Sequence, residues 1–198
     1  MNVLLNGRGG KVGSVLGPGL EAAGHVLVDE LAAAEAMGDF TQPDAVAANV
    51  RAAVAAGVPS VVGTTGWDTA EFESAPVAVF YAPNFAIGAV LMMRFAEEAV
   101  RHLPSAEIIE LHHAAKVDAP SGTAKLTAER MGGDVPIHSV RLPGLNAHQE
   151  VILGGLGQVL TIRHDATSRE AYTPGVLLAL ERLPSLPPGL TVGLDALL

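Results

Sequence analysis

The chain has 198 residues, enough for one large domain or two small ones and for a core without disulfide or metal staples. Its formal net charge of −9 argues against a nucleic-acid or anionic-membrane partner. Cysteine is absent, which excludes a disulfide scaffold, a thiolate zinc site, a cysteine nucleophile and an iron–sulfur cluster. The apolar runs are too short for a transmembrane helix and the N-terminus shows no signal peptide, so we expect a cytoplasmic protein.

The first part of the chain alternates between short apolar runs and helical segments. We expect a strand at 3–5, a helix over 14–24, a strand at 26–28, a helix over 44–56, and strands at 60–63 and 77–81. Alternation of this kind predicts an α/β domain with a parallel, doubly wound sheet.

The pattern changes after residue 84. We expect a helix over 86–102, a strand over 107–113, a helix over 121–131, strands over 137–142, 148–153 and 158–164, and a helix over 174–182. The three consecutive strands predict a mainly antiparallel sheet in an α+β domain. The chain should therefore form two domains, with a junction near residues 83–88.

A glycine-rich loop follows the first strand. Gly7, Gly10 and Gly13 form the pattern G-x-x-G-x-x-G, although the stricter G-x-G-x-x-G would need a glycine where Val12 stands. Glycines let the backbone approach a pyrophosphate, and the N-terminus of the next helix offers free N–H groups. We expect a dinucleotide site here, the alternative being a tight turn with no ligand.

Other residues around the same sheet support this prediction. Asp29 lies 22 residues after Gly7, where an acidic side chain would bind a ribose hydroxyl, and Lys11 would face phosphate. The two leave the choice between NADH and NADPH open, since the acid favours a free 2′-hydroxyl and the cation a 2′-phosphate. The segments 64–66 and 82–85 end predicted strands, where ligands bind in open α/β sheets.

A second candidate site lies between residues 110 and 123. His112 and His113 are adjacent on a predicted strand, so they point to opposite faces and are poor joint ligands for a metal. One histidine as a general acid and one as an anion binder, beside the fixed charge of Lys116, fits better. The alternative is a pair of surface histidines on an edge strand.

A helix start follows this segment. Residues 121–123, Ser-Gly-Thr, offer N–H groups and two hydroxyls at a positive helix end, so a carboxylate would bind well there. Plain helix capping is the alternative. Arg141 and Arg163 are expected to be surface or interface side chains rather than ligands.

The string E-L-H-H-A-A-K-V-D-A-P-S-G-T-A, from Glu110 to Ala124, resembles the signature of the 4-hydroxy-tetrahydrodipicolinate reductase (dihydrodipicolinate reductase) family. The resemblance extends over nearly the whole chain. It includes the glycine loop and the segments 39–43, 63–66, 82–88, 140–144, 147–151, 161–165 and 174–176.

The resemblance implies a set of functional residues. His112 would be the proton donor and Lys116 the catalytic lysine. The residues expected to hold the substrate carboxylates are His113, Lys116, Ser121, Gly122 and Thr123. The loop patterns described above and the resemblance together predict a set of residues that hold NADH or NADPH. They are Gly7, Gly10, Lys11, Val12, Gly13, Asp29, Gly63, Thr64, Thr65, Ala82, Pro83, Asn84 and Phe85.

The resemblance also implies an architecture and an activity. A Rossmann-like dinucleotide domain over 1–84 would be completed by 173–198, and residues 85–172 would bind substrate and build a homotetramer. The reaction would be NAD(P)H-dependent reduction of a cyclic dicarboxylate in lysine and diaminopimelate biosynthesis, with no metal, nucleic acid or membrane involved. The alternatives are another nicotinamide-dependent enzyme, such as an aspartate dehydrogenase, or a dinucleotide-binding protein that has lost activity.

The chain departs from the family pattern in its first half. Only residues 32–38 separate Leu31 from Asp39, where the family has a longer stretch with another strand and helix. This shortening makes the ribose contact of Asp29, the cofactor preference and the strand order open questions.

Overall fold

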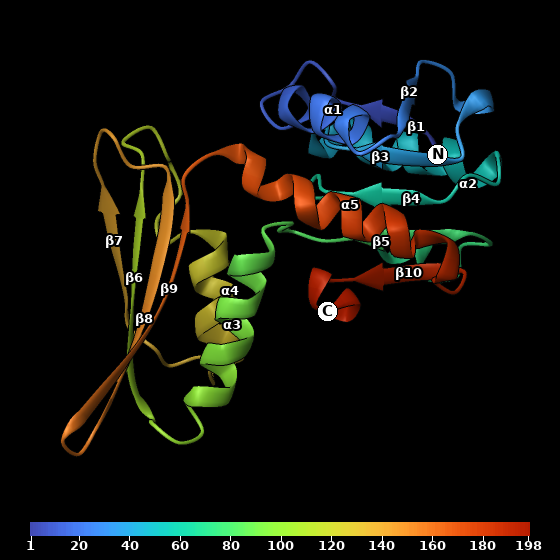
Figure 1. The fold of residues 1–198 in the computed structure, drawn as a ribbon. Coiled ribbons are helices and arrows are strands. Elements are labelled where there is room, and N and C mark those ends of the chain that lie inside the picture. Colours follow the sequence, from blue (N-terminus) through green and yellow to red (C-terminus); the bar gives the residue numbers. More distant parts are fainter. The chain divides into compact units, whose positions relative to one another are not determined.

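The computed structural model describes residues 1–198, which divide into two compact units. The first unit comprises residues 1–87 and 169–198, and the second comprises residues 88–168, so the chain passes between them twice (Figure 1). Each unit has its own sheet, six-stranded in the first and four-stranded in the second. None of the helices combines the length and apolar composition needed to cross a bilayer.

The first unit is a parallel sheet with helices packed against it. Its strands are β1 (Asn2–Asn6), β2 (Val26–Val28), β3 (Ala36–Asp39), β4 (Ser60–Val62), β5 (Ala78–Tyr81) and β10 (Gly189–Val192). Its helices are α1 (Gly13–Ala22), α2 (Pro43–Ala55) and α5 (Thr173–Arg182). The strand order is β10-β5-β4-β3-β1-β2 and every neighbouring pair is parallel, which confirms the predicted parallel α/β sheet.

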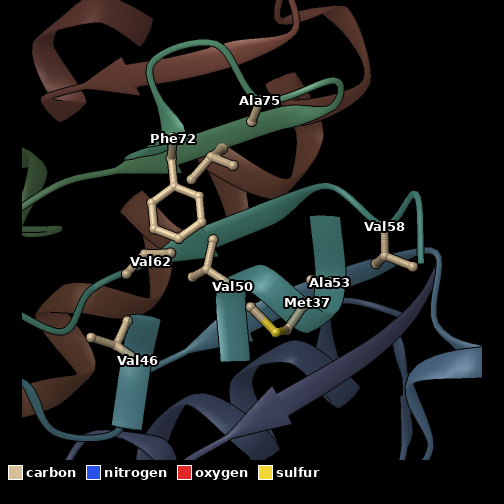
Figure 2. Close-up of a cluster of buried hydrophobic side chains, with 9 residues drawn as sticks. Met37, Val46, Val50, Ala53, Val58, Val62, Phe72 and Ala75 are labelled. Atoms are coloured by element: carbon tan, nitrogen blue, oxygen red, sulfur yellow. The ribbon is translucent and has the colours of Figure 1, made fainter. Parts of the chain in front are cut away.

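Helix α2 buries one stripe of side chains against this sheet. Val46, Val50 and Ala53 are four and three residues apart, so they share a helix face, and all three are fully buried. They pack in one cluster with Met37 of β3 and Val62 of β4 (Figure 2). Burying a valine or methionine side chain contributes about 1.5–3 kcal/mol, so this cluster fixes α2 on the sheet.

Two strands of this sheet are absent from the sequence-based prediction. Strand β3 has the sequence Ala-Met-Gly-Asp, and β10 follows the proline-rich segment 184–188. Both have only four residues, and their hydrogen-bond partners come from distant parts of the chain. The connection from β2 to β3 takes only residues 29–35 and contains one 3₁₀ turn, Leu31–Ala33, instead of an α-helix.

The second unit packs two helices on one face of its sheet. The elements are α3 (Ile87–Ala99), β6 (Ser105–His112), α4 (Gly122–Arg130), β7 (Ile137–Arg141), β8 (Ala147–Gly155) and β9 (Gln158–Ala166). Helices α3 and α4 lie side by side, joined by an ion pair between Glu97 and Arg130 at 2.8 Å (Figure 1). Ile108, Val151 and Leu153 are fully buried.

The predicted antiparallel sheet is only partly matched. Its order is β7-β6-β8-β9, in which β8 is antiparallel to both neighbours, as expected. Strand β7 instead runs parallel to β6 and does not pair with β8. The reason is the connection through α4, because a helix carries the chain back along the sheet and lets the next strand run in the same direction.

At two positions of the glycine loop, close contacts leave no room for a side chain. Gly7 has φ +84°, and a Cβ there would lie 2.3 Å from the carbonyl oxygen of Phe40. A Cβ on Gly13 would lie 2.0 Å from the carbonyl oxygen of Gly7. A Cβ on Gly9, by contrast, would meet nothing within 4 Å. The loop therefore folds tightly against the start of α1 and leaves its tip open.

We predict that Gly13→Ala lowers the free energy of unfolding by about 1–3 kcal/mol, because the new methyl group must displace backbone. Gly9→Ala is the matched control and should change it by less than about 0.5 kcal/mol. Urea denaturation followed by Trp67 fluorescence measures both, since this single tryptophan contacts Phe72 and Tyr81 in the first unit. Equal stability of the two variants would contradict this account of the loop.

Candidate active site

The first unit brings the predicted cofactor residues to one edge of its sheet. Loops 7–13, 40–43, 63–66 and 82–86 follow β1, β3, β4 and β5, which are consecutive neighbours in the sheet. Because all these strands are parallel, their carboxyl ends share an edge, where ligands bind in open α/β folds. The exposed Asp29 follows β2 at the same edge.

These loops contact one another through an aromatic side chain. The ring of Phe40 packs on that of Phe85, with centroids 5.6 Å apart. A Cβ on Gly63 would lie 2.2 Å from the Phe40 ring, so only glycine leaves room for it. The loops after β3, β4 and β5 are thus packed together.

A buried carboxylate that the sequence analysis did not single out supports the same loops. Asp39 ends β3 and is fully buried. Its Oδ1 accepts hydrogen bonds from the Thr41 N–H at 3.2 Å and from the hydroxyls of Thr41 at 2.7 Å and Thr64 at 2.9 Å. Its Oδ2 accepts one from Asn49 at 2.7 Å. In the sequence, Asp39 is the first residue of the segment 39–43 that carries part of the family resemblance, but that segment did not indicate a buried carboxylate.

In the second unit, strands β6 and β7 place three side chains in contact. Their register sets His112 opposite Arg141 and Glu110 opposite Ser139. The Nδ1 of His112 lies 2.5 Å from Oε2 of Glu110. Arg141 donates to both oxygens of Glu110, at 2.8 and 2.7 Å. A histidine, a carboxylate and a guanidinium therefore form one chain of charge-assisted hydrogen bonds.

The pKa values follow from this arrangement. Burial alone would raise the pKa of Glu110, but its hydrogen bonds, led by those from Arg141, hold it at about 2. Its stabilisation is therefore complete above its ordinary value of 4.5 and is lost as the pH falls towards about 2. Burial lowers the pKa of His112; Glu110 opposes this, and the charges of Lys116 and Arg141 lower it further.

The segment after β6 carries the remaining candidates. Lys116 contacts both oxygens of Asp118, at 2.7 and 2.9 Å, and its hydrogen bond holds the pKa of Asp118 below its ordinary value. Ser121 caps α4 as predicted, accepting a hydrogen bond from the Ala124 N–H at 3.2 Å. A Cβ on Gly122 would meet nothing within 4 Å, so the start of this helix is open at Gly122, whereas Ser121 is buried and donates its N–H to Glu110.

Two expectations need correction. Strand β6 ends at His112, so His113 lies in the following turn, where its carbonyl accepts the Lys116 N–H at 3.0 Å. Arg141 is not a surface side chain, because it pairs with the buried Glu110 and keeps only 18% of its side chain exposed. Arg163 is 47% exposed and pairs with Glu150 and Asp165, which fits its expected surface position.

Two sequence profiles match the chain. "Dihydrodipicolinate reductase, N-terminus" covers residues 24–85, and "Dihydrodipicolinate reductase, C-terminus" covers residues 88–198. The chain belongs to the dihydrodipicolinate reductase family. The glycine loop lies before the first matched range, whereas the whole segment from Glu110 to Thr123 lies inside the second.

Named relatives are similar over most of their length. A 4-hydroxy-tetrahydrodipicolinate reductase of Desulfitobacterium hafniense is 49% identical, with 89% of this chain and 79% of the relative aligned. That of Mycolicibacterium gilvum is 42% identical, with 100% and 99% aligned. A solved structure, the dipicolinate-bound dihydrodipicolinate reductase of Paenisporosarcina sp. TG-14, has a TM-score of 0.86 and 30% identity over 100% of this chain and 99% of the other.

The chain is shorter than such relatives. Its alignment with the M. gilvum reductase spans 243 positions against 198 residues here, so 45 positions have no residue of this chain. More distant proteins share the fold alone. One is an aspartate semialdehyde dehydrogenase of Vibrio cholerae, at 11% identity and a TM-score of 0.58, aligned over 94% of this chain and 99% of the other.

We predict that Asp39→Ala lowers the free energy of unfolding by about 3 kcal/mol, because it leaves buried donors such as the Thr64 hydroxyl without a partner. Asp39→Asn should cost less, since the amide of Asn49 can turn and offer its oxygen. Urea denaturation followed by Trp67 fluorescence separates the two. If the alanine variant were as stable as the wild type, Asp39 would not organise these loops.

Proposed function

We propose that the chain catalyses the NAD(P)H-dependent reduction of 4-hydroxy-tetrahydrodipicolinate to tetrahydrodipicolinate in lysine and diaminopimelate biosynthesis. The observation that carries the proposal is the joined arrangement of His112, Glu110 and the start of α4 in a chain of this family. Relatives of 42–49% identity bear the name of this enzyme.

The first unit fits a dinucleotide. No side chain caps the N-terminus of α1, which leaves its positive end for a pyrophosphate. The open space at Gly9 lets such a group approach the backbone. Lys11, Val12 and the residues after β4 and β5 would line the remainder of the site. When bound, the reduced nicotinamide supplies a hydride to the substrate.

The second unit would hold the substrate and supply the proton. The carboxylates of a cyclic dicarboxylate would bind to His113, Lys116 and the Ser121–Thr123 helix start. The Lys116 side chain keeps 22% of its surface exposed, so a substrate carboxylate can reach it beside Asp118. The 4-hydroxyl group would first leave as water together with a hydrogen of the adjacent ring carbon, which forms a C=C bond. The hydride would then add to one carbon of this bond, and His112 would donate a proton to the other.

The proposal includes an assembly and a location. The sheet of the second unit has α3 and α4 on one face (Figure 1), and we propose that its other face builds a homotetramer, as the resemblance implies. We propose a cytoplasmic location as well, since the named relatives are biosynthetic reductases.

A coupled assay tests the proposal directly. Pyruvate and aspartate semialdehyde, with the preceding synthase, supply the substrate, and the loss of absorbance at 340 nm is followed separately with NADH and NADPH. We expect turnover with at least one of them, which also gives the cofactor preference. A folded protein that binds NAD(P)H without turnover would favour the binding-only alternative.

We predict that His112→Gln lowers kcat by about 10²–10⁴-fold, the usual contribution of a positioned proton donor, while NAD(P)H affinity stays nearly unchanged. The control is His138→Gln, because His138 makes a similar contact with a glutamate, Glu107 at 2.9 Å, but is exposed. Fluorescence titration measures cofactor binding. Equal losses of turnover and cofactor affinity in His112→Gln would assign a structural role to His112.

A further inference from the structure

The carboxylate of Glu110 is fully buried and has four hydrogen-bond partners, one of which is the side chain of Ser139 on β7. Its Oε2 lies 2.5 Å from Nδ1 of His112. Its Oε1 accepts a hydrogen bond from the Ser121 N–H at 3.3 Å, where α4 begins. Both oxygens accept from Arg141. One side chain thus touches the proposed proton donor and the proposed carboxylate cradle at the same time.

We propose that Glu110, held by Arg141, is the positioning residue for proton donation by His112. This inference rests on the proposed function and extends it to two residues that neither transfer a proton nor bind the substrate. Glu110 lies two residues before His112 on β6, so both side chains project to the same side of the sheet. The contact between them is therefore fixed by the strand itself.

The contact determines which ring nitrogen carries out the reaction. A carboxylate whose pKa is held at about 2 is ionised and accepts a hydrogen bond from Nδ1–H, so the neutral ring carries its hydrogen on Nδ1. The other ring nitrogen, Nε2, is then the one that can exchange a proton with the substrate. A ring without this partner could turn or change its tautomer, and it would then offer the wrong nitrogen.

Arg141 has two tasks in this arrangement. It keeps Glu110 ionised and in place through a fork of two hydrogen bonds. Its Nη2 also donates to the Asp118 carbonyl at 2.7 Å, which ties down the segment that carries Lys116. The proton donor and the lysine segment are therefore held by one guanidinium.

Burial lowers the pKa of His112, and the charges around the ring change it further. Glu110 on the same strand raises the pKa of His112, whereas Arg141 on β7 and Lys116 in the following segment lower it. Asp118 contacts Lys116 and not the imidazole. Since a general acid works only when protonated, activity falls as the pH rises through the pKa of His112. This fall in activity forms the alkaline limb of the pH profile of kcat. Removing the charge of Glu110 lowers the pKa of His112 and must therefore move the alkaline limb to lower pH.

The first test removes the charge and keeps the shape. In Glu110→Gln we expect the alkaline limb of the kcat profile to move to lower pH and kcat at pH 7.5 to fall about tenfold, with NAD(P)H affinity unchanged. Glu107→Gln is the matched control, because Glu107 contacts His138 from the same strand at an exposed position. An unmoved alkaline limb in folded Glu110→Gln would overturn the proposal.

The second test removes the partner without leaving a lone buried charge. The double variant Glu110→Met and Arg141→Met keeps an apolar interior, and such replacements of buried ion pairs are often tolerated. Nitrogen-15 NMR of labelled histidines should show the Nδ1–H tautomer of His112 in the wild type and its loss in the double variant. Here kcat should fall about 10- to 100-fold at every pH. Retention of the wild-type tautomer would overturn the proposal.

The two variants also separate this inference from the proposed function. The tautomer is measured without substrate or cofactor, so it reports on Glu110 even if the assay shows no turnover. If Glu110→Gln does not fold, the double variant decides the outcome. A loss of the tautomer together with wild-type kcat in the double variant would show that orientation of the ring does not matter, which contradicts the proposal.

Discussion

The carboxylate of Glu110 has no contact with solvent, so all its hydrogen bonds must come from protein groups. Those groups come from three places in the chain: its own strand, the neighbouring strand β7 with Arg141 and Ser139, and the start of α4. The second unit cannot satisfy this one side chain without fixing β6, β7 and α4 relative to one another. The geometry of the candidate site is therefore a consequence of how a buried charge is accommodated.

The first unit also contains a buried carboxylate whose hydrogen bonds come from protein groups. Asp39 is also fully buried, but its partners are hydroxyl, amide and backbone groups instead of a guanidinium. It joins the loop after β3 to the loop after β4, whereas Glu110 joins a strand to a helix start. In both units a short side chain at or near the end of a strand organises residues that we assign to ligands.

The sequence predicted local features well and distant pairings poorly. The helix start at Ser121 depends on neighbouring residues and was predicted correctly. Strand β3, with a glycine among four residues, is a strand only because β1 and β4 flank it. Arg141 was expected to be a surface or interface side chain because a lone arginine on a strand gives no sign of its partner, which lies 31 residues away. The roles of Asp39 and Glu110 were missed because hydrogen bonds across a fold leave no local pattern.

The short edge strand β2 has a consequence for aggregation. Strand β2 pairs on one side only, with β1, and forms an edge of the six-stranded sheet. An open edge is a template on which another chain can add a strand and begin to aggregate. Here the edge has only three residues, and Asp29 and Glu30 follow it at once. Its shortness and these charges limit pairing with another molecule, so the sheet needs no further strand to protect it.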